Sequence, residues 1–327
     1  MNKATLKWII TLTVAISMSI AGTTYYLTVN YGKRRLIIST TTSLYDTGLL
    51  ELLEDKFEEK YPVDVSFISA GTGKAIQLAK RGDADLILVH APKRERTFLD
   101  GGYGLFRKII AYNFFVIVGP SDDPAEIEGL NITEALANIV DAGRKGQIVW
   151  ISRGDESGTH IKEMNLWSMA GFEWNQLRDE EWFMESGTGM GKTLLIANER
   201  NAYTLSDIGT YLKYREENLI DLEILVDKGK ELLNVYSVIA VNPDKVPTVN
   251  FGDALLFIKF LISNECQTLI GEFKKDVYGE SLFHPAVPLL KEEGESPIAQ
   301  WIKEMAFING TECPPQYWNI FEYRDGE

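Results

Sequence analysis

The chain has 327 residues and a formal net charge of −14, from 33 Lys and Arg against 47 Asp and Glu, and 45% of its residues are hydrophobic. This length is sufficient to bury one large core or two smaller ones. The acidic balance, without any basic stripe, argues against binding to nucleic acid, because the chain would repel phosphates. Recognition of a small anion must therefore come from local dipoles and hydrogen bonds at close range.

The first thirty residues have the composition of an export or membrane segment. Two lysines precede an apolar and small-polar run, residues 8–26, that contains no acidic residue. We assign residues 1–30 to a signal peptide or an N-terminal membrane anchor and expect an exported protein on the extracellular or periplasmic face of the membrane. The basic residues at 33–35 argue against export, because such residues are disfavoured beyond the span. The spacing of Cys266 and Cys313 does not decide whether they form a disulfide.

Strand and helix patterns then alternate along the chain, which indicates an α/β fold. Buried strands are predicted at residues 36–38, 63–68, 86–89, 114–118 and 148–151. Amphipathic helices are predicted between the strands, for example at residues 49–60 and 74–81.

Two apolar strands that each end in a proline turn, at residues 112–120 and 236–243, resemble each other. A chain that crosses to a second lobe along one strand and returns along another has two lobes joined by two hinges, with the ligand in the cleft between them. The alternative is two ordinary core strands. We predict a two-lobed fold with two crossover hinges. The predicted boundaries are lobe 1 at 35–115 and 240–292, lobe 2 at 116–239, and a C-terminal extension at 293–327.

Two hydroxyl-rich stretches, residues 40–43 and 69–73, each follow a predicted strand and open a predicted helix. Free backbone N–H groups at a helix start, joined by side-chain hydroxyls, form a site for an anion without a metal. The alternative interpretation is ordinary helix capping by Ser and Thr. A cap needs a single hydroxyl, however, and the glycines at 71 and 73 let the backbone turn N–H groups toward a ligand.

A third polar turn, residues 152–160, follows the predicted strand at 148–151 and contains Arg153. A guanidinium offers a planar fork of donors that suits an oxyanion. The alternative is an ion pair of Arg153 with Asp155 or Glu156, and the sequence leaves both open. Asp155 and Asp207 are also candidates for an acceptor that would suit a protonated oxyanion such as phosphate.

Patterns for other functions are weak. Residues 187–193 imitate a phosphate-binding P-loop, but Ser186 stands where the first glycine is needed, so a glycine-rich helix start lining the cleft fits better. His90, His160 and His284 lack the spacing of metal ligands, and we expect His90 to be a structural hydrogen-bonding residue and no metal site. No Gly-x-Ser-x-Gly elbow indicates a hydrolase.

Several motifs together resemble the extracytoplasmic tungstate-binding proteins of ABC importers, within the type II periplasmic solute-binding proteins, over roughly residues 36–290. The motifs are STTTS at 39–43, DTGL at 46–49, GTGKA at 71–75, GDAD at 82–85, VHAP at 89–92, SRGDESGTH at 152–160, TGMG at 188–191 and YTLSDIGTY at 203–211. The chain departs from that family in lacking a lipid-attachment cysteine and in its tail after residue 292.

The resemblance implies a monomeric, non-enzymatic receptor that captures tungstate, or molybdate, between its lobes and delivers it to a permease driven by an ATPase. It implies no cofactor. The site residues it implies are Thr41, Thr42, Ser43, Ser69 and Thr72 from one lobe, Arg153 and Ser157 from the other, and Tyr203 and Thr204 in the wall. The alternatives are a receptor for phosphate or another small oxyanion, an enzyme acting on an anionic metabolite, and a membrane-attached sensor.

Overall fold

The computed structural model describes residues 16, 18, 19, 34–155, 157–279, 281–291 and 296–317. The segment assigned to a signal peptide or anchor therefore lies almost wholly outside the described residues. Within them, no single helix has the length and hydropathy to span a bilayer. One pair, Phe251–Leu261 with Asn264–Tyr278, meets both criteria together but is bent by 63°.

The elements alternate as the sequence patterns predict, and the α/β class is confirmed. The strands are β1 (Arg34–Thr40), β2 (Val63–Ser69), β3 (Leu86–Val89), β4 (Gly104–Gly119), β5 (Trp150–Ser152), β6 (Phe183–Glu185), β7 (Thr204–Asp207), β8 (Glu223–Val226), β9 (Leu233–Val241) and β10 (His284–Pro285). The helices before β9 are α2 (Thr42–Tyr45), α3 (Leu49–Lys60), α4 (Thr72–Arg81), α5 (Pro92–Asp100), α6 (Ile132–Arg144), α7 (Gly158–Met169), α8 (Trp174–Leu177), α9 (Met190–Glu199), α10 (Ile208–Glu216) and the 3-10 turn η1 (Lys230–Leu232). Those after it are α11 (Phe251–Leu261), α12 (Asn264–Glu272), α13 (Lys275–Tyr278), α14 (Ala286–Lys291), α15 (Pro297–Ala306) and the 3-10 turn η2 (Pro315–Tyr317).

The first lobe is built on a mixed sheet of order β10-β4-β9-β3-β1-β2. Its parallel strands β2, β1 and β3 align Thr40 with Ser69 and with Leu88, so their carboxyl ends meet at one edge. The loops that carry the predicted anion donors leave this edge. In open α/β sheets ligands bind beyond the carboxyl ends of the strands.

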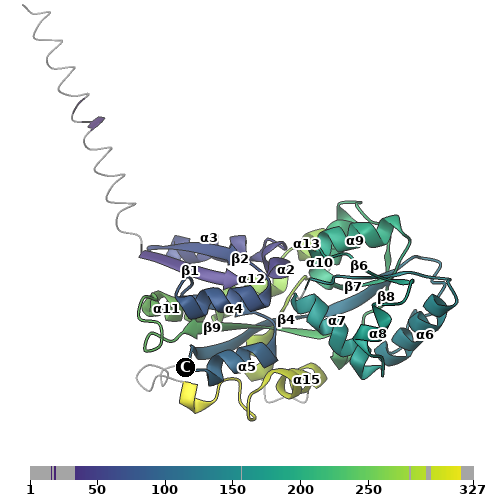
Figure 1. The fold of residues 1–327 in the computed structure, drawn as a ribbon. Coiled ribbons are helices and arrows are strands. Elements are labelled where there is room, and N and C mark those ends of the chain that lie inside the picture. The colour runs from purple at the N-terminus through teal and green to yellow at the C-terminus, as the bar shows by residue number, and fades with distance from the viewer. Residues whose placement is uncertain are drawn as a thin grey trace, which may run out of the picture.

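β4 joins the two lobes, and Figure 1 shows it running from one body of the molecule into the other. It pairs with β9 as far as Phe114 and with β7 from Phe115 onward. β9 pairs with β4 or β3 along its whole length. Residues 233–239, which we predicted in lobe 2, therefore lie in the sheet of the first lobe. The second of the two similar proline turns lies at the end of β9. The chain returns to the first sheet already at the beginning of β9.

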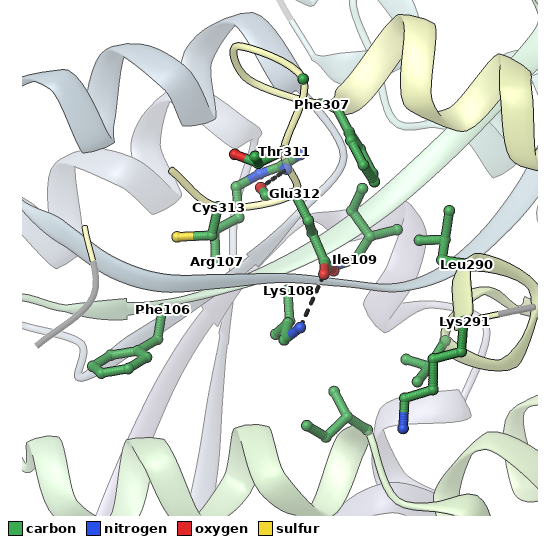
Figure 2. A pocket seen from close by; sticks show the side chains of 13 residues that line it. Phe106, Arg107, Lys108, Ile109, Leu290, Lys291, Phe307, Thr311, Glu312 and Cys313 are labelled. Atoms are coloured by element: carbon green, nitrogen blue, oxygen red, sulfur yellow. Dashed lines mark hydrogen bonds and ion pairs between the residues drawn. The ribbon is translucent and has the colours of Figure 1, made fainter. Parts of the chain in front are cut away.

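The described part of the C-terminal extension packs on the first lobe. Ile302 and Ala306 of α15 are buried against Leu233 and Val235 at the start of β9. Beyond α15, the Glu312 carboxylate accepts a hydrogen bond from the Ile109 backbone and pairs with Lys108 at 2.9 Å. Figure 2 shows this segment closing one side of a cavity of about 610 Å³ that contains none of the predicted site residues.

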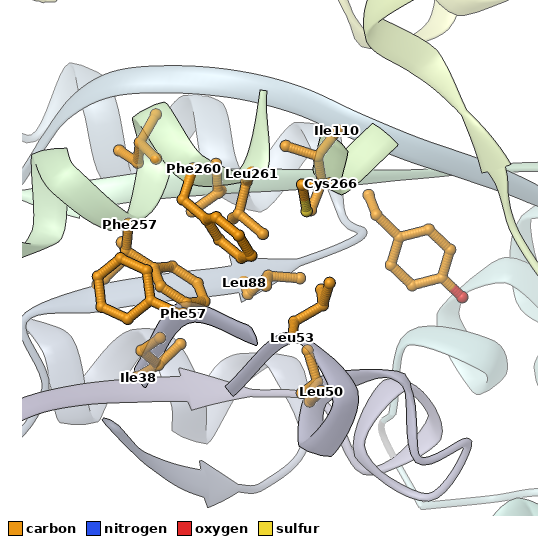
Figure 3. Close-up of a cluster of buried hydrophobic side chains, with 14 of the residues drawn as sticks. Ile38, Leu50, Leu53, Phe57, Leu88, Ile110, Phe257, Phe260, Leu261 and Cys266 are labelled. Atoms are coloured by element: carbon orange, nitrogen blue, oxygen red, sulfur yellow. The ribbon is translucent and has the colours of Figure 1, made fainter. Parts of the chain in front are cut away.

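Separate hydrophobic cores stabilise the two lobes. In the first, side chains from β1, α3, β3, β4, α11 and α12 converge (Figure 3), with the rings of Phe57 and Phe257 packed edge to face at 4.9 Å. In the second, Trp150 and Trp167 pack edge to face at 5.1 Å. Burying side chains of this size contributes several kcal/mol in each core, so each lobe offers a firm frame for the loops between them.

Candidate functional site

The hydroxyl-rich helix starts of the first lobe do not use their hydroxyls as caps. Thr41 at the start of α2 makes no side-chain capping bond, and α4 begins after Gly71, which has no side chain, while the hydroxyl of Thr72 has no partner among the described residues. Asn131 of α6 and Ser157 of α7, by contrast, each accept a hydrogen bond from a backbone N–H in the first helical turn. The capping interpretation therefore fails for α2 and α4, and the first-turn N–H groups of the ten-residue α4 are available to a ligand.

Thr41, Ser43 and Thr72 are buried together with His90 at the carboxyl edge of the first sheet. Ser43 Oγ lies 3.5 Å from Thr41 Oγ1 and 3.4 Å from His90 Nε2. His90 is the residue directly after β3, so the parallel alignment of β1 and β3 brings it beside the loop that follows β1.

The second lobe closes on this edge with the N-terminal turns of α7 and α10. A Cβ atom on Gly158, the first residue of α7, would lie 3.3 Å from His90 Nε2 and 3.4 Å from Thr72 Oγ1. At α10, a Cβ on Gly209 would lie 3.3 Å from Thr47 Cγ2. The dipoles of α4, α7 and α10 thus all point their positive ends toward the junction of the lobes.

Arg153 is held at this junction by a rigid support. It follows β5 directly, and its backbone carbonyl accepts hydrogen bonds from Gly187 N at 2.9 Å and Ser186 Oγ at 3.2 Å. Gly154 has φ +61°, and a Cβ there would lie 2.7 Å from Glu185 Cβ, so only glycine fits. The glycine-rich segment that imitates a P-loop therefore supports the arginine loop from behind.

The guanidinium of Arg153 is 3% exposed and only partly paired. One Nη atom bonds Asp155, which fulfils the ion-pair alternative, and the other lies 3.4 Å from Thr159 Oγ1. The Asp155 carboxylate also accepts from Ser157 N at 3.1 Å. The ion pair does not exclude the anion-binding alternative, because a guanidinium has five donors and Asp155 uses only part of them.

Three buried donors have no hydrogen-bond partner in the described part of the chain: Thr72 Oγ1 and Arg153 Nε, one from each lobe at the junction, and Ser237 Oγ on β9. A buried polar group without a partner costs about 1–3 kcal/mol, so native structures rarely retain one without a functional reason. We call Thr41, Ser43, Thr72, Arg153 and Ser157 the donor cluster. An oxyanion among them would receive hydrogen bonds from both lobes.

The nearby carboxyl groups are already engaged. Asp207 caps α10 and accepts from Thr210 N at 2.9 Å and Thr210 Oγ1 at 2.8 Å. Burial raises the pKa of Asp207. Glu163, behind the arginine loop, accepts from Trp150 Nε1 at 2.7 Å and Ser152 Oγ at 2.9 Å, and burial raises its pKa to about 7. Both oxygens of Asp155 and of Asp207 thus already accept a hydrogen bond from the protein.

The remaining predicted site residues fall outside the donor cluster. Thr42 is half-buried at the first position of α2, and Ser69 is exposed at the end of β2. Tyr203 and Thr204, which we predicted in the wall, use their hydroxyls for hydrogen bonds within the second lobe. Tyr203 donates to Asp123 at 2.8 Å, and Thr204 donates to the backbone of Ile151 at 2.7 Å.

Sequence reasoning missed the position of His90 in the site, although its expected hydrogen-bonding role holds. Its Nδ1 lies 2.8 Å from Asn234 Oδ1, a partner 144 residues away that no local pattern indicates. The signal that could have found it is the VHAP motif, which places a polar ring at the end of a buried parallel strand. Among the described residues, no group of three or more His, Cys, Asp or Glu side chains could hold a metal ion.

Comparisons with known proteins show the family to which the chain belongs. A family model of the PBP superfamily domain matches residues 21–265. The tungstate-binding protein TupA of Peptoclostridium acidaminophilum is 40% identical over 257 residues, which are 77% of this chain and 86% of that protein.

Two solved structures are also similar. The tungstate-binding protein TupA from Desulfovibrio alaskensis G20 is 39% identical with a TM-score of 0.68, covering 77% of this chain and 98% of that one. The tungstate ABC transporter structure from Geobacter sulfurreducens is 43% identical with a TM-score of 0.65, covering 73% and 98%. The chain therefore belongs to the PBP superfamily and, within it, to the family of the TupA tungstate-binding proteins.

Proposed function

We propose that this protein is an extracytoplasmic receptor that binds tungstate, with molybdate as a second ligand, and delivers it to the permease and ATPase of an ABC importer. The donor cluster holds the anion between the lobes. The tungstate-binding function of the relatives named above supports this proposal. Release follows when the lobes separate, because ligand binding shifts an equilibrium between open and closed forms.

The observation that carries the proposal is that Thr72 Oγ1 from one lobe and Arg153 Nε from the other are both buried donors without a hydrogen-bond partner among the described residues. Tungstate is a fully deprotonated dianion near neutral pH, so it can accept from every donor and needs no acceptor in return. Phosphate carries a proton in part and is best matched by a free carboxylate. The carboxylates at this site, Asp155 and Asp207, are bonded to protein donors, which favours the dianion.

Thermal unfolding with added oxyanions tests the ligand. Tungstate binds only the folded state, so it should raise the unfolding temperature once its concentration exceeds the Kd. At 100 times the Kd, the free energy of unfolding should rise by about 2.7 kcal/mol. Phosphate and sulfate should have little effect. If neither tungstate nor molybdate shifts the transition while the protein is folded, the proposed ligand is wrong.

Arginine variants test the site. Arg153→Ala removes a 3% exposed guanidinium from the junction and should abolish the tungstate-dependent shift while leaving a folded protein. Arg144→Ala, also in the second lobe, removes an arginine that is 52% exposed and paired with Glu180, and serves as the matched control. Equal affinity of the two variants for tungstate would remove Arg153 from the site.

A further inference from the structure

A chain of buried amides fixes which ring nitrogen of His90 carries hydrogen. The backbone oxygen of Leu282 accepts from Asn113 Nδ2 at 3.3 Å, so the side-chain oxygen of Asn113 faces Asn234 and accepts from Asn234 Nδ2 at 3.0 Å. The oxygen of Asn234 must then face His90 Nδ1, at 2.8 Å. An amide oxygen can only accept, so Nδ1 carries the hydrogen and Nε2 of the neutral ring is an acceptor.

This acceptor lies inside the donor cluster. His90 Nε2 is 3.4 Å from Ser43 Oγ, and the position of a Cβ on Gly158 is 3.3 Å from Nε2 and 3.4 Å from Thr72 Oγ1. Ser43 has a single hydroxyl hydrogen, which can go to Nε2, to Thr41 Oγ1 or to a bound anion. If it goes to the anion, a buried lone pair on Nε2 faces the Ser43 oxygen and the anion without any hydrogen between them, which is costly.

We propose that His90 takes up one proton from solvent when the oxyanion binds. The imidazolium then donates from Nε2 to Ser43 Oγ, and Ser43 donates its own hydrogen to the anion, so every group in the relay has a partner. The N–H bond on Nε2 forms as an O–H bond of a hydronium ion in the solvent breaks and leaves water, and the site gains one positive charge together with the dianion. This inference rests on the proposed oxyanion-binding function.

The surroundings keep His90 neutral until an anion arrives. Burial, together with the charges of Arg153 and Lys162, lowers the pKa of His90 to about 4, against the hydrogen bond from the ring to Asn234. A dianion beside the ring acts in the opposite direction and raises the pKa. The charged and titratable groups around the ring are Arg153, Lys162 of α7, Lys93 and Arg94 of α5, and Tyr236 of β9, whose ring centre is 4.9 Å away.

The consequence is a pH-dependent affinity. Because the bound form holds one more proton, tungstate should bind more tightly as pH falls, by up to about tenfold per pH unit while the pH lies between the pKa of His90 in the free and bound proteins. A receptor that relies on Arg153 and hydroxyls alone would show no such slope above neutral pH.

Calorimetric titration with tungstate in two buffers of different ionisation enthalpy, such as Tris and HEPES, measures the proton count directly. We expect uptake approaching one proton per anion in the wild-type chain and in the control His284→Asn. In His90→Asn, whose amide can still donate to Asn234, the uptake should disappear.

Binding without uptake in the wild-type chain overturns the inference. Uptake that persists in His90→Asn also overturns it and points to Glu163 or Asp207. Absence of tungstate binding to the wild-type chain refutes the proposed function instead.

A spectroscopic measurement decides the matter even if His90→Asn does not fold. The chain has three histidines, so their ring nitrogen signals can be resolved by ¹⁵N NMR and distinguished by substituting the other two. Adding tungstate to the full chain should move Nε2 of His90 from the chemical shift of a bare nitrogen to that of a protonated one. An unchanged Nε2 signal with tungstate bound overturns the inference.

Discussion

Replacing Thr72 by valine separates binding from folding at the donor cluster. Thr72 is fully buried, and its hydroxyl has no hydrogen-bond partner among the described residues. Valine keeps the shape and removes a polar group whose burial costs about 1–3 kcal/mol. Without tungstate, the free energy of unfolding of Thr72→Val should be unchanged or about 1 kcal/mol higher. With tungstate, the lost hydrogen bond to a charged ligand is worth about 1.5–3 kcal/mol, a Kd increase of about 10- to 100-fold.

The same substitution at Thr204 provides the contrast. The Thr204 hydroxyl is also buried but donates to the backbone of Ile151 at 2.7 Å. Thr204→Val should therefore lower the free energy of unfolding by about 1 kcal/mol, without removing a donor to the anion. Urea unfolding and calorimetric titration of both variants measure the two effects. If Thr72→Val destabilises the free protein as Thr204→Val does and leaves tungstate affinity unchanged, Thr72 is a structural residue and the reasoning from partnerless donors is refuted.

Three other predictions concern charged and titratable side chains. Burial raises the pKa of Glu163 from 4.5 to about 7, so the folded state holds this proton longer than the unfolded state, and up to about 3 kcal/mol of stability is lost as pH rises through that range. The pKa of His90 is lowered from 6.5 to about 4, so His90 makes stability rise with pH between those values. Thermal unfolding of Glu163→Gln should therefore show stability rising with pH in the range where the wild-type stability changes less. Arg107→Met leaves the fully buried Glu95 without its ion-pair partner at 2.7 Å and should cost about 3–5 kcal/mol in urea unfolding. Adding Glu95→Leu should recover only part of this loss, because Glu95 also accepts from Ala91 N at 2.7 Å. Glu312→Ala removes the bonds to Lys108 and Ile109, so limited proteolysis should cut near residues 308–313 faster than in the wild type.

Local patterns predicted the elements that carry the donors. The apolar periodicity predicted a helix at 49–60, and α3 spans Leu49–Lys60. The hydroxyl-rich turns were assigned to helix starts after strands, where the structure has them. These predictions succeed because a helix start depends on a few consecutive residues, whose capping and backbone preferences are visible in the sequence.

Contacts between distant residues were beyond the sequence. β4 is 16 residues long, and only its second half was predicted, because its first half contains the consecutive charged residues Arg107 and Lys108, whose partners Glu95 and Glu312 lie elsewhere in the chain. Tyr203 and Thr204 lie in a motif of the family, yet their hydroxyls point into the second lobe. A sequence shows which groups can donate a hydrogen bond, whereas the fold determines which of these groups donate to other protein groups and which remain available to a ligand.

The net charge of −14 raises the question of how such a chain holds a dianion. Arg153 supplies one positive charge to the site, and Asp155 already offsets part of it. Neutral hydroxyls and helix N-termini supply partial charges, and burying them costs little free energy while no ligand is bound. A second permanently charged side chain would need its own counter-charge in the free protein. A histidine that becomes charged only with the ligand resolves this conflict. The neutral ring costs little in the free protein, and the imidazolium balances the anion when it is bound. We therefore expect the proton on His90 to be the adjustable part of the charge balance, which makes affinity depend on pH while the free protein stays stable.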